Sequence, residues 1–295
     1  MDYLSALVAG LGAGSLYAVI GVLLVIMFTL TKVVNFSQVA VGVYAAFLSI
    51  RFGHFLTDLG VTKPLLTVLS VIFAIIVGAL LSALIGWIIS MFLPTASTST
   101  RSAVTVAGML FLISLSLLQF GPLAQPLIPL VIGPFFSFDI VIVTKISVFM
   151  LGLAILILII AKIVLNKTNV GIQLRAIADR PTAVELLGVN VKALQVGVWA
   201  ASGAFMTLAI MIGGNNLASQ ATVSADLIIP GAAAALIGAF KKLNFALIGG
   251  LALGAVQGVI VMWPEISVFR DWIAILIIIF FLLWNQRKEV WDVAR

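Results

Sequence analysis

Long apolar runs separated by short polar segments dominate the sequence. Leu4 to Leu30 spans 27 residues without a charge, and about 20 apolar residues are enough to cross the hydrocarbon core of a bilayer. Further apolar runs occupy residues 31–50, 64–93, 103–119, 138–161, 193–212, 227–240, 244–262 and 268–284. We therefore expect an all-α polytopic membrane protein with about eight or nine transmembrane or partly re-entrant helices.

Two regions do not fit simple crossings. Residues 121–137 contain four prolines, which exclude a continuous helix there. The 227–240 run is short and contains Pro230 and Gly231. A discontinuous or re-entrant element fits this run or the first fifty residues, provided that protein or water covers its free backbone groups.

The longest polar interruption, residues 162–192, contains five of the sixteen basic residues. Pro181 suits the first position of a helix, and Asp179 just before it can cap the free N–H groups. Gly188 suits the left-handed turn that ends a helix. The pattern predicts a short helix that either docks a soluble partner or lies as an amphipathic loop on lipid headgroups.

Composition agrees with a bilayer as the solvent. The chain is 63% hydrophobic and 9% charged, whereas soluble domains carry about 25% charged residues. The net charge of +6 is typical of membrane proteins with basic cytoplasmic loops, so it does not indicate nucleic-acid binding. The absence of cysteine and the single His54 disfavour disulfides, thiolate chemistry and a histidine metal site.

The distribution of cations predicts a topology. The loops at 162–192 and 241–242 and the C-terminal tail are basic, so we place them in the cytoplasm. The loops at 120–138 and 213–226 have no Lys or Arg and are placed outside. Arg270 in the outer loop at 263–272 departs from this pattern.

Glycines in the first run resemble a phosphate-binding loop only superficially. Gly10, Gly12, Gly14 and Gly21 follow no strand, and no Lys-Ser/Thr pair follows them. Small residues that allow close helix packing explain them better.

The sequence is poor in groups for catalysis or ion coupling. The carboxylates fall in loops or at the ends of spans, whereas membrane enzymes and ion-coupled carriers place such groups at depth. The chain also lacks a G-x-x-x-x-G-K-[ST] loop, so uphill transport would need energy from another subunit. The alternatives are a stand-alone secondary carrier for a small solute and a purely structural membrane subunit.

The run TNVGIQLRAIADRPTAVELLGVNV resembles the cytoplasmic loop of inner-membrane permeases of ABC importers in the branched-chain amino acid class. The shared pattern falls at Gly171, Arg175-Ala176, Ala183 and Gly188-Val189-Asn190. The Gly-rich first run and the segment LIIPGAAAALIGAFKKLNFALIGG also resemble that family, so the likeness covers nearly the whole chain. Departures occur at Ser37-Gln38 and at Gly238–Lys242, so we expect a substrate path that differs from that of a typical member.

The resemblance implies a single transmembrane permease domain over residues 1–295, with a coupling loop at 162–192. It implies half of a translocation pathway for a small solute, such as branched-chain or other amino acids, in a bacterial inner membrane. Its expected partners are a longer paralogous permease, two cytoplasmic ABC ATPases and an extracytoplasmic solute-binding protein. No cofactor is expected in this chain, because ATP and Mg would bind to the ATPase subunits.

Three groups of residues have predicted roles: the first follows from the capped helix and its resemblance to the family loop, and the other two from polar side chains at the edges of spans and in an outer loop. ATPase coupling is assigned to six positions of the basic loop: Gly171, Arg175, Ala183, Glu185, Leu187 and Gly188. Asn35, Gln38 and Tyr44 either lie on the translocation path or bond between helices. Asn215, Asn216 and Gln220 either face the binding protein or form a solvated loop.

Overall fold

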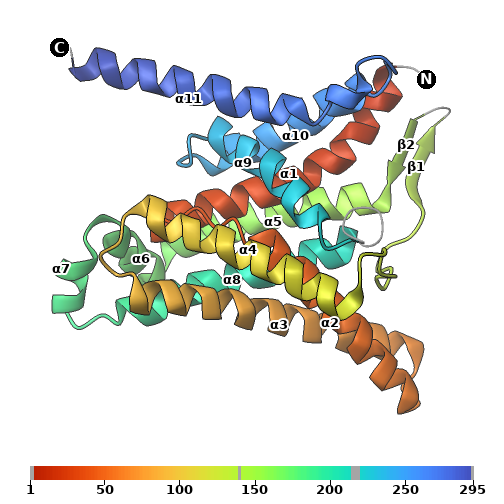
Figure 1. Cartoon of the computed structure of the whole chain (residues 1–295), viewed down its shortest axis with the longest axis horizontal. Coiled ribbons are helices and arrows are strands. Elements are labelled where there is room, and N and C mark those ends of the chain that lie inside the picture. The colour runs from red at the N-terminus through yellow and green to blue at the C-terminus, as the bar shows by residue number, and fades with distance from the viewer. Residues whose placement is uncertain (1–2, 139–140, 214–219, 294–295) are drawn as a thin grey trace. The chain divides into compact units, whose positions relative to one another are not determined.

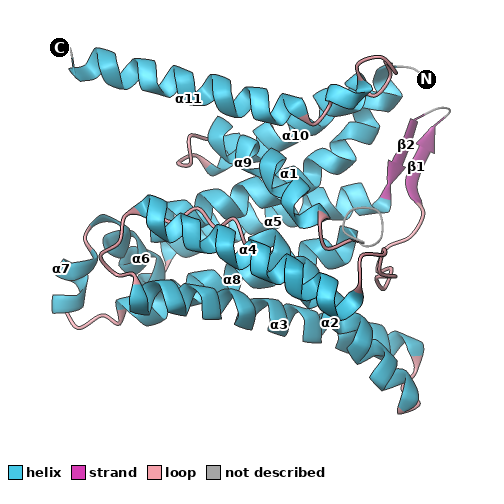
Figure 2. Cartoon of the chain, in the orientation of Figure 1, coloured by secondary structure: helices cyan, strands magenta, loops and turns pink. Residues whose placement is uncertain are grey.

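The computed structural model describes residues 3–138, 141–213 and 220–293, and in these ranges the chain is mostly helical (Figures 1 and 2). The helices are α1 (Tyr3–Thr31), α2 (Gln38–Asp58), α3 (Lys63–Phe92), α4 (Thr98–Phe120), α5 (Lys145–Lys167), α6 (Asn169–Asp179), α7 (Pro181–Leu186), α8 (Val191–Gly213), α9 (Val223–Ile237), α10 (Leu243–Ile260), the short 3-10 helix η2 (Ser267–Phe269) and α11 (Trp272–Val293). The strands β1 (Pro134–Phe138) and β2 (Val141–Thr144) form one antiparallel hairpin.

Membrane spans are numerous among the described residues. Seven helices, α1 to α5, α8 and α10, are long and apolar enough to cross a bilayer. Two shorter apolar helices, α9 and the first part of α11, bring the number of apolar helices to the upper end of the predicted range. The expected all-α polytopic architecture is therefore confirmed.

The chain forms two compact units. Unit 1 contains residues 1–25, 133–154 and 229–295, and unit 2 contains residues 26–132 and 155–228. The division falls inside α1, α5 and α9, so each of these helices contributes to both units. The single permease domain expected from the sequence stays a prediction.

In unit 2, α3 and α8 pack side by side along a stripe of small residues (Figure 1). The buried positions of α3 recur every fourth residue: Ser70, Ala74, Gly78, Ser82 and Gly86. On α8, Gly203 approaches Gly78 and Ser82, while Trp199 lies against Gly86. The absence of large side chains on this face of α3 is what lets the two backbones approach.

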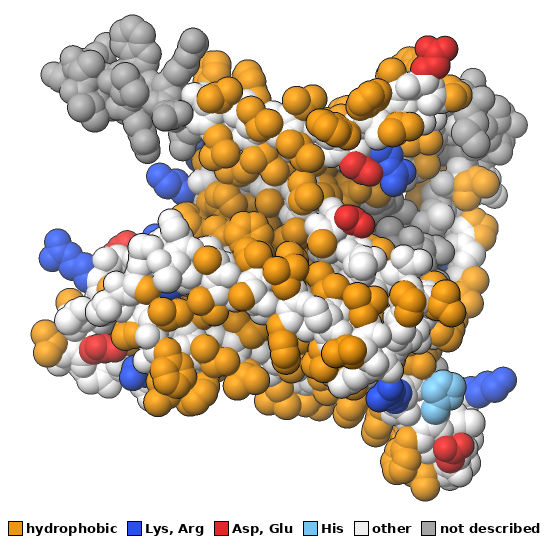
Figure 3. Space-filling view, in the orientation of Figure 1, with side chains coloured by type: hydrophobic (Ala, Val, Ile, Leu, Met, Phe, Trp, Pro, Cys, Tyr) orange, Lys and Arg blue, Asp and Glu red, His pale blue; other side chains and the backbone are white. Residues whose placement is uncertain are grey.

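The opposite face of α3 is covered by exposed large apolar side chains. These include Leu65, Val68, Ile72, Ile76, Leu80 and Leu84. Figure 3 shows hydrophobic side chains over α3 and α4, with charged side chains near the two ends of unit 2. A band of this kind is suited to contact with lipid.

Two glycines of α8 allow a matched test of this packing. Alanine at Gly203 would overlap Ser82 and the Gly78 carbonyl oxygen, whereas alanine at Gly197 meets no atom within 4 Å. We expect Gly203→Ala to destabilise the protein by about 1–3 kcal/mol through overpacking. Gly197→Ala should be neutral or stabilising, because alanine favours helix by about 1 kcal/mol. Thermal unfolding of the purified proteins checks this, and equal midpoints for the two variants would contradict it.

The glycines of α1 have the packing role expected from the sequence. In unit 1, a Cβ at Gly14 would lie 3.0 Å from the Gly250 carbonyl oxygen, and one at Gly21 would lie 2.9 Å from Ala234 Cβ. A Cβ at Gly10 would come within 2.9 Å of Gly258 Cα. These positions are close helix contacts with α9 and α10, not a phosphate loop.

Three boundaries predicted from the sequence are wrong. Residues 134–138 and 141–144 form the strands of the hairpin, so α5 begins only at Lys145 and continues to Lys167. Helix α2 runs to Asp58, beyond the predicted end of the apolar run at residue 50, so Arg51 and His54 lie inside a helix. Helix α9 is unbroken from Val223 to Ile237 with Pro230 inside it.

Candidate functional site

Most basic side chains of unit 2 lie at one end, which we call the basic end. Here α6 and α7 lie beside the first residues of α8, close to the end of α3 and the start of α4 (Figure 1). Seven of the nine Lys and Arg residues of unit 2 belong to this end: Lys32, Arg101, Lys162, Lys167, Arg175, Arg180 and Lys192. Arg51 of α2 and Lys63 of α3 lie elsewhere, so the charge of the unit is strongly one-sided.

A tight corner joins α5 to α6. The hydroxyl of Thr168 donates to the Val164 carbonyl oxygen at 2.7 Å and accepts from the Gly171 N–H at 3.1 Å. A Cβ at Gly171 would overlap the Val164 carbonyl oxygen and lie 2.6 Å from Leu165 Cα. Glycine is therefore required where α6 turns back against the end of α5.

Helix α7 is anchored on one face and exposed on the other. Buried Val184 packs with Ile177 of α6 and Val191 of α8. Leu186 and Leu187 at its end are 86% and 82% exposed. An adjacent pair of leucines held outward on an anchored helix is a candidate contact surface for another protein.

The ends of α7 agree only partly with the prediction. Pro181 is the first helical residue, and Gly188 has a φ of 80° just beyond the last turn, as expected. The capping role assigned to Asp179 is wrong, because Asp179 ends α6 and Arg180 occupies the N-cap position. No side chain makes a capping hydrogen bond there.

The six predicted coupling residues divide by burial. Gly171 is buried in the α5–α6 corner, whereas Arg175, Ala183, Glu185, Leu187 and Gly188 are all exposed on α6, α7 or the following turn. The five exposed residues all lie at the basic end of unit 2. Their coupling role stays a prediction.

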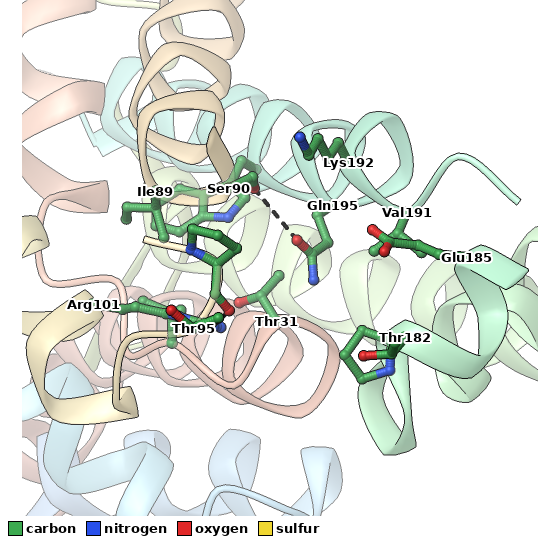
Figure 4. A pocket seen from close by; sticks show the side chains of 14 residues that line it. Thr31, Ile89, Ser90, Thr95, Arg101, Thr182, Glu185, Val191, Lys192 and Gln195 are labelled. Carbon is green, nitrogen blue, oxygen red and sulfur yellow. Dashed lines mark hydrogen bonds between the residues drawn. The ribbon is translucent and has the colours of Figure 1, made fainter. Parts of the chain in front are cut away.

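A cavity of about 240 Å³ lies between α7 and the rest of the basic end (Figure 4). It is lined by Thr31 and Val33 beside the end of α1, Ile89, Ser90, Pro94 and Thr95 around the end of α3, Arg101 of α4, Pro181, Thr182 and Glu185 of α7, and Val191, Lys192, Gln195 and Trp199 of α8. The Ser90 hydroxyl donates to Gln195 Oε1 at 3.3 Å across its wall. Open space, and not a packed core of side chains, therefore lies between α7 and the end of α1.

The connection between α1 and α2 is a buried, irregular segment. Lys32 has a φ of 55°, and the chain stays non-helical until Gln38. Asn35, Ser37 and Gln38 are each 0% exposed. The Ser202 hydroxyl of α8 lies 3.5 Å from Gln38 Oε1. A buried break between two helices needs polar partners for its backbone, and other parts of the protein supply them here.

Two hydroxyls of α4 supply those partners. The Val34 N–H donates to Ser102 Oγ at 3.1 Å, and the Phe36 N–H donates to Thr105 Oγ1 at 3.0 Å. The Thr105 hydroxyl also lies 3.0 Å from the Val34 carbonyl oxygen. We call Ser102 and Thr105 the hydroxyl clamp.

Tyr44 lies further along α2 and makes a different contact. Its hydroxyl donates to Gln119 Oε1 of α4 at 3.0 Å. Arg51 donates to the Gln119 carbonyl oxygen at 2.6 Å and lies 4.6 Å from the centre of the Phe120 ring. Tyr44 thus bonds α2 to α4, as the interhelical alternative requires, and none of Asn35, Gln38 and Tyr44 lines the cavity beside α7. Their place on a translocation path stays a prediction.

The predicted binding-protein contacts are only partly visible. Asn215 and Asn216 lie outside the described residues. Gln220 is exposed just before α9. The docking role of the three stays a prediction.

Sequence reasoning missed the hydroxyl clamp and helix α6. Ser102 and Thr105 stand at the start of an apolar run, and their partners lie 68 and 69 residues away. No local sequence pattern predicts such a long-range contact. For α6 a signal exists, because Gly171, Leu174 and Ile177 are buried at a spacing of three residues.

Residues 6–283 match the protein family described as the permease component of the branched-chain amino acid transport system. The chain belongs to this family. The match covers both units and all seven candidate spans, so the permease family confirms the resemblance seen in the basic loop. It also agrees with the expectation that the chain is not an enzyme.

One curated relative of this permease is described as a probable branched-chain amino acid transport permease protein LivH, from Methanocaldococcus jannaschii. The two are 37% identical over 109 residues, which is 36% of this chain. The alignment spans 34% of the relative, about a third of its length. No solved structure matches the permease.

Proposed function

We propose that this permease is one transmembrane subunit of an ATP-driven importer and forms half of the translocation pathway. The solute is a branched-chain or other small amino acid. A second, paralogous permease completes the pathway, and an extracytoplasmic binding protein delivers the solute. Two cytoplasmic ATPase subunits bind ATP and Mg. Membership of the family and the exposed leucine pair on α7 support the proposal.

The basic end faces the cytoplasm in this proposal. Seven basic side chains gather there, and cytoplasmic segments of membrane proteins retain Lys and Arg. The C-terminal tail, which contains Arg287 and Lys288, is placed on the same side of a prokaryotic plasma membrane.

The ATPase docks on α7. Leu186 and Leu187 are exposed, but Val184 holds the helix on α6 and α8. Fully burying one leucine contributes about 1.5–3 kcal/mol, so the pair is enough to act as a local anchor. Arg175, Ala183, Glu185 and Gly188, which are also exposed on α6, α7 and the following turn, complete the docking surface in this proposal.

The cavity beside α7 gives the docked ATPase a route to the pathway. Pro181, Thr182 and Glu185 of α7 line it together with Thr31 and Val33, which flank the break after α1. The unfilled space leaves room for α7 to move relative to the end of α1 while Val184 stays packed on Ile177 of α6. Nucleotide-driven movement of α7 would thereby bias the segment that contains Asn35 and Gln38, as a two-state coupling requires.

The far end of α8 receives the binding protein. Gln220, which follows α8 in the chain, is exposed, and α8 begins at the basic end, which supports placing the two docking surfaces at opposite ends of this helix. Asn215 and Asn216 complete this surface in the proposal.

Reconstitution tests the function directly. Proteoliposomes that contain this permease, its paralogue and the ATPases should accumulate radiolabelled leucine only when binding protein is outside and ATP is available on the ATPase side. A non-hydrolysable nucleotide is the control. Uptake against a gradient by this chain alone, without nucleotide, would contradict the proposal and establish a secondary carrier.

A further inference from the structure

The amide of Asn35 is held in one orientation. Its Oδ1 accepts from the Ser37 N–H at 3.1 Å and from the Ser37 hydroxyl at 2.7 Å. A backbone N–H can only donate, so the atom that it contacts must be the oxygen of the amide. The Nδ2 group therefore points to the other side, and the assignment does not depend on a choice of amide flip.

This Nδ2 group has no hydrogen-bond partner among the described residues, although Asn35 is 0% exposed. Leaving a buried donor unpaired is unfavourable, and such groups are uncommon in folded proteins. The fold does not remove this cost. The amide oxygen is held by its hydrogen bonds to Ser37, and the backbone on both sides of Asn35 is held by hydrogen bonds to α4, so the amide cannot turn to find a partner. A donor maintained in this way is suited to an acceptor that arrives from outside the chain.

The hydroxyl clamp fixes the backbone on both sides of Asn35. Ser102 receives the N–H of Val34, and Thr105 receives the N–H of Phe36. Ser102 is 9% exposed and Thr105 is 0% exposed, so these bonds do not compete with solvent. The clamp thus sets where the Nδ2 group lies without touching the amide itself.

We propose that Asn35 Nδ2 donates a hydrogen bond to a carboxylate oxygen of the transported solute, and that Ser102 and Thr105 are its positioning residues. The inference rests on the proposed function, because the solute must be an amino acid. Among possible acceptors, a carboxylate would form the strongest hydrogen bond with this donor, since hydrogen bonds to charged groups are about twice as strong as those between neutral groups. Asn35 is 0% exposed in this structure, so in this proposal the residues around the amide move aside to admit the solute.

Two sets of variants test the proposal in the whole importer with saturating binding protein. Asn35→Asp keeps an oxygen for Ser37 but replaces the donor with a negative charge. Thr105→Val removes the hydroxyl at nearly constant shape, and Thr105→Ser retains it. The readouts are leucine taken up, ATP hydrolysed in response to binding protein, and the midpoint of thermal unfolding.

We expect Asn35→Asp to lower the leucine carried per ATP by about tenfold, the loss of one hydrogen bond to a charged group. ATP hydrolysis should stay within about twofold of the unmodified importer, because docking is unchanged. Thr105→Val should lower the leucine carried per ATP as Asn35→Asp does, and Thr105→Ser should carry about as much leucine per ATP as the unmodified protein.

Several outcomes would overturn the proposal. Unchanged leucine per ATP in Asn35→Asp would mean that the amide holds only water, since an aspartate can also bind water. Equal defects in Thr105→Val and Thr105→Ser, or a joint fall of uptake, ATP hydrolysis and thermal midpoint, would assign the clamp a structural role alone.

Failure of the proposed function can be distinguished from failure of the inference about Asn35. If the unmodified importer carries no branched-chain amino acid, the carboxylate assignment falls with it. Hydrogen–deuterium exchange of residues 33–38 then still tests the positioning role of the hydroxyl clamp. Faster exchange in Thr105→Val than in Thr105→Ser supports the positioning role, and equal exchange overturns it.

Discussion

Replacing Leu186 and Leu187 together by serine should abolish ATP-driven uptake while leaving the permease folded in the membrane. Both side chains are more than 80% exposed, so their loss removes little packing from the chain itself. In the proposed complex they form the centre of the ATPase contact, where truncation of a hot-spot residue costs about 2 kcal/mol or more. The affinity for the ATPase should fall at least about thirtyfold.

Retention of the ATPase during purification of the complex measures this effect. The matched control is Leu123→Ser, because Leu123 is 78% exposed but follows the far end of α4. The control should retain the ATPase and transport normally. Equal retention of the ATPase by the double variant and the control would exclude α7 as the docking surface.

Alanine at Gly171 should separate ATP hydrolysis from uptake. The added methyl group would overlap the Val164 carbonyl oxygen and the Leu165 backbone at the corner between α5 and α6, and these backbone atoms cannot rotate away as a flexible side chain can. The cheapest response is a shift of α6, which carries α7 through the contact of Ile177 with Val184. We expect a destabilisation of about 1–3 kcal/mol and a loss of leucine carried per ATP of at least about tenfold.

Gly152→Ala provides the control for Gly171→Ala. Gly152 lies in α5 as well, and a Cβ there meets no atom within 4 Å. The control should match the unmodified importer in thermal midpoint and in leucine per ATP. Normal coupling in Gly171→Ala would show that the position of α6 does not matter for energy transfer.

The sequence predicted the features that depend on local chemistry. Apolar length identified the spans, and Pro181 with Gly188 marked the ends of α7, because a missing N–H and a positive φ are properties of single residues. The strands at 134–138 and 141–144 were missed because apolar strands and an apolar span have the same composition there.

The candidate site was predictable only in part. The sequence separated the apolar runs at 4–30 and 31–50, and the structure places the break between the first two helices at residues 32–37. The hydroxyl clamp comes from α4 through tertiary packing, so no periodicity in the sequence connects it to Asn35. Asp179 had the right chemistry for a cap, but continuation of α6 through it left Arg180 in the capping position.

The side of the membrane on which α7 lies tests the central claim most directly. The chain contains no cysteine, so Leu187→Cys introduces a single thiol at an exposed position, and Leu123→Cys does the same at the other end of unit 2. A membrane-impermeant maleimide should label position 187 only in inside-out vesicles and position 123 only in right-side-out vesicles. Labelling of position 187 from the outside would contradict a cytoplasmic docking surface and the account built on it.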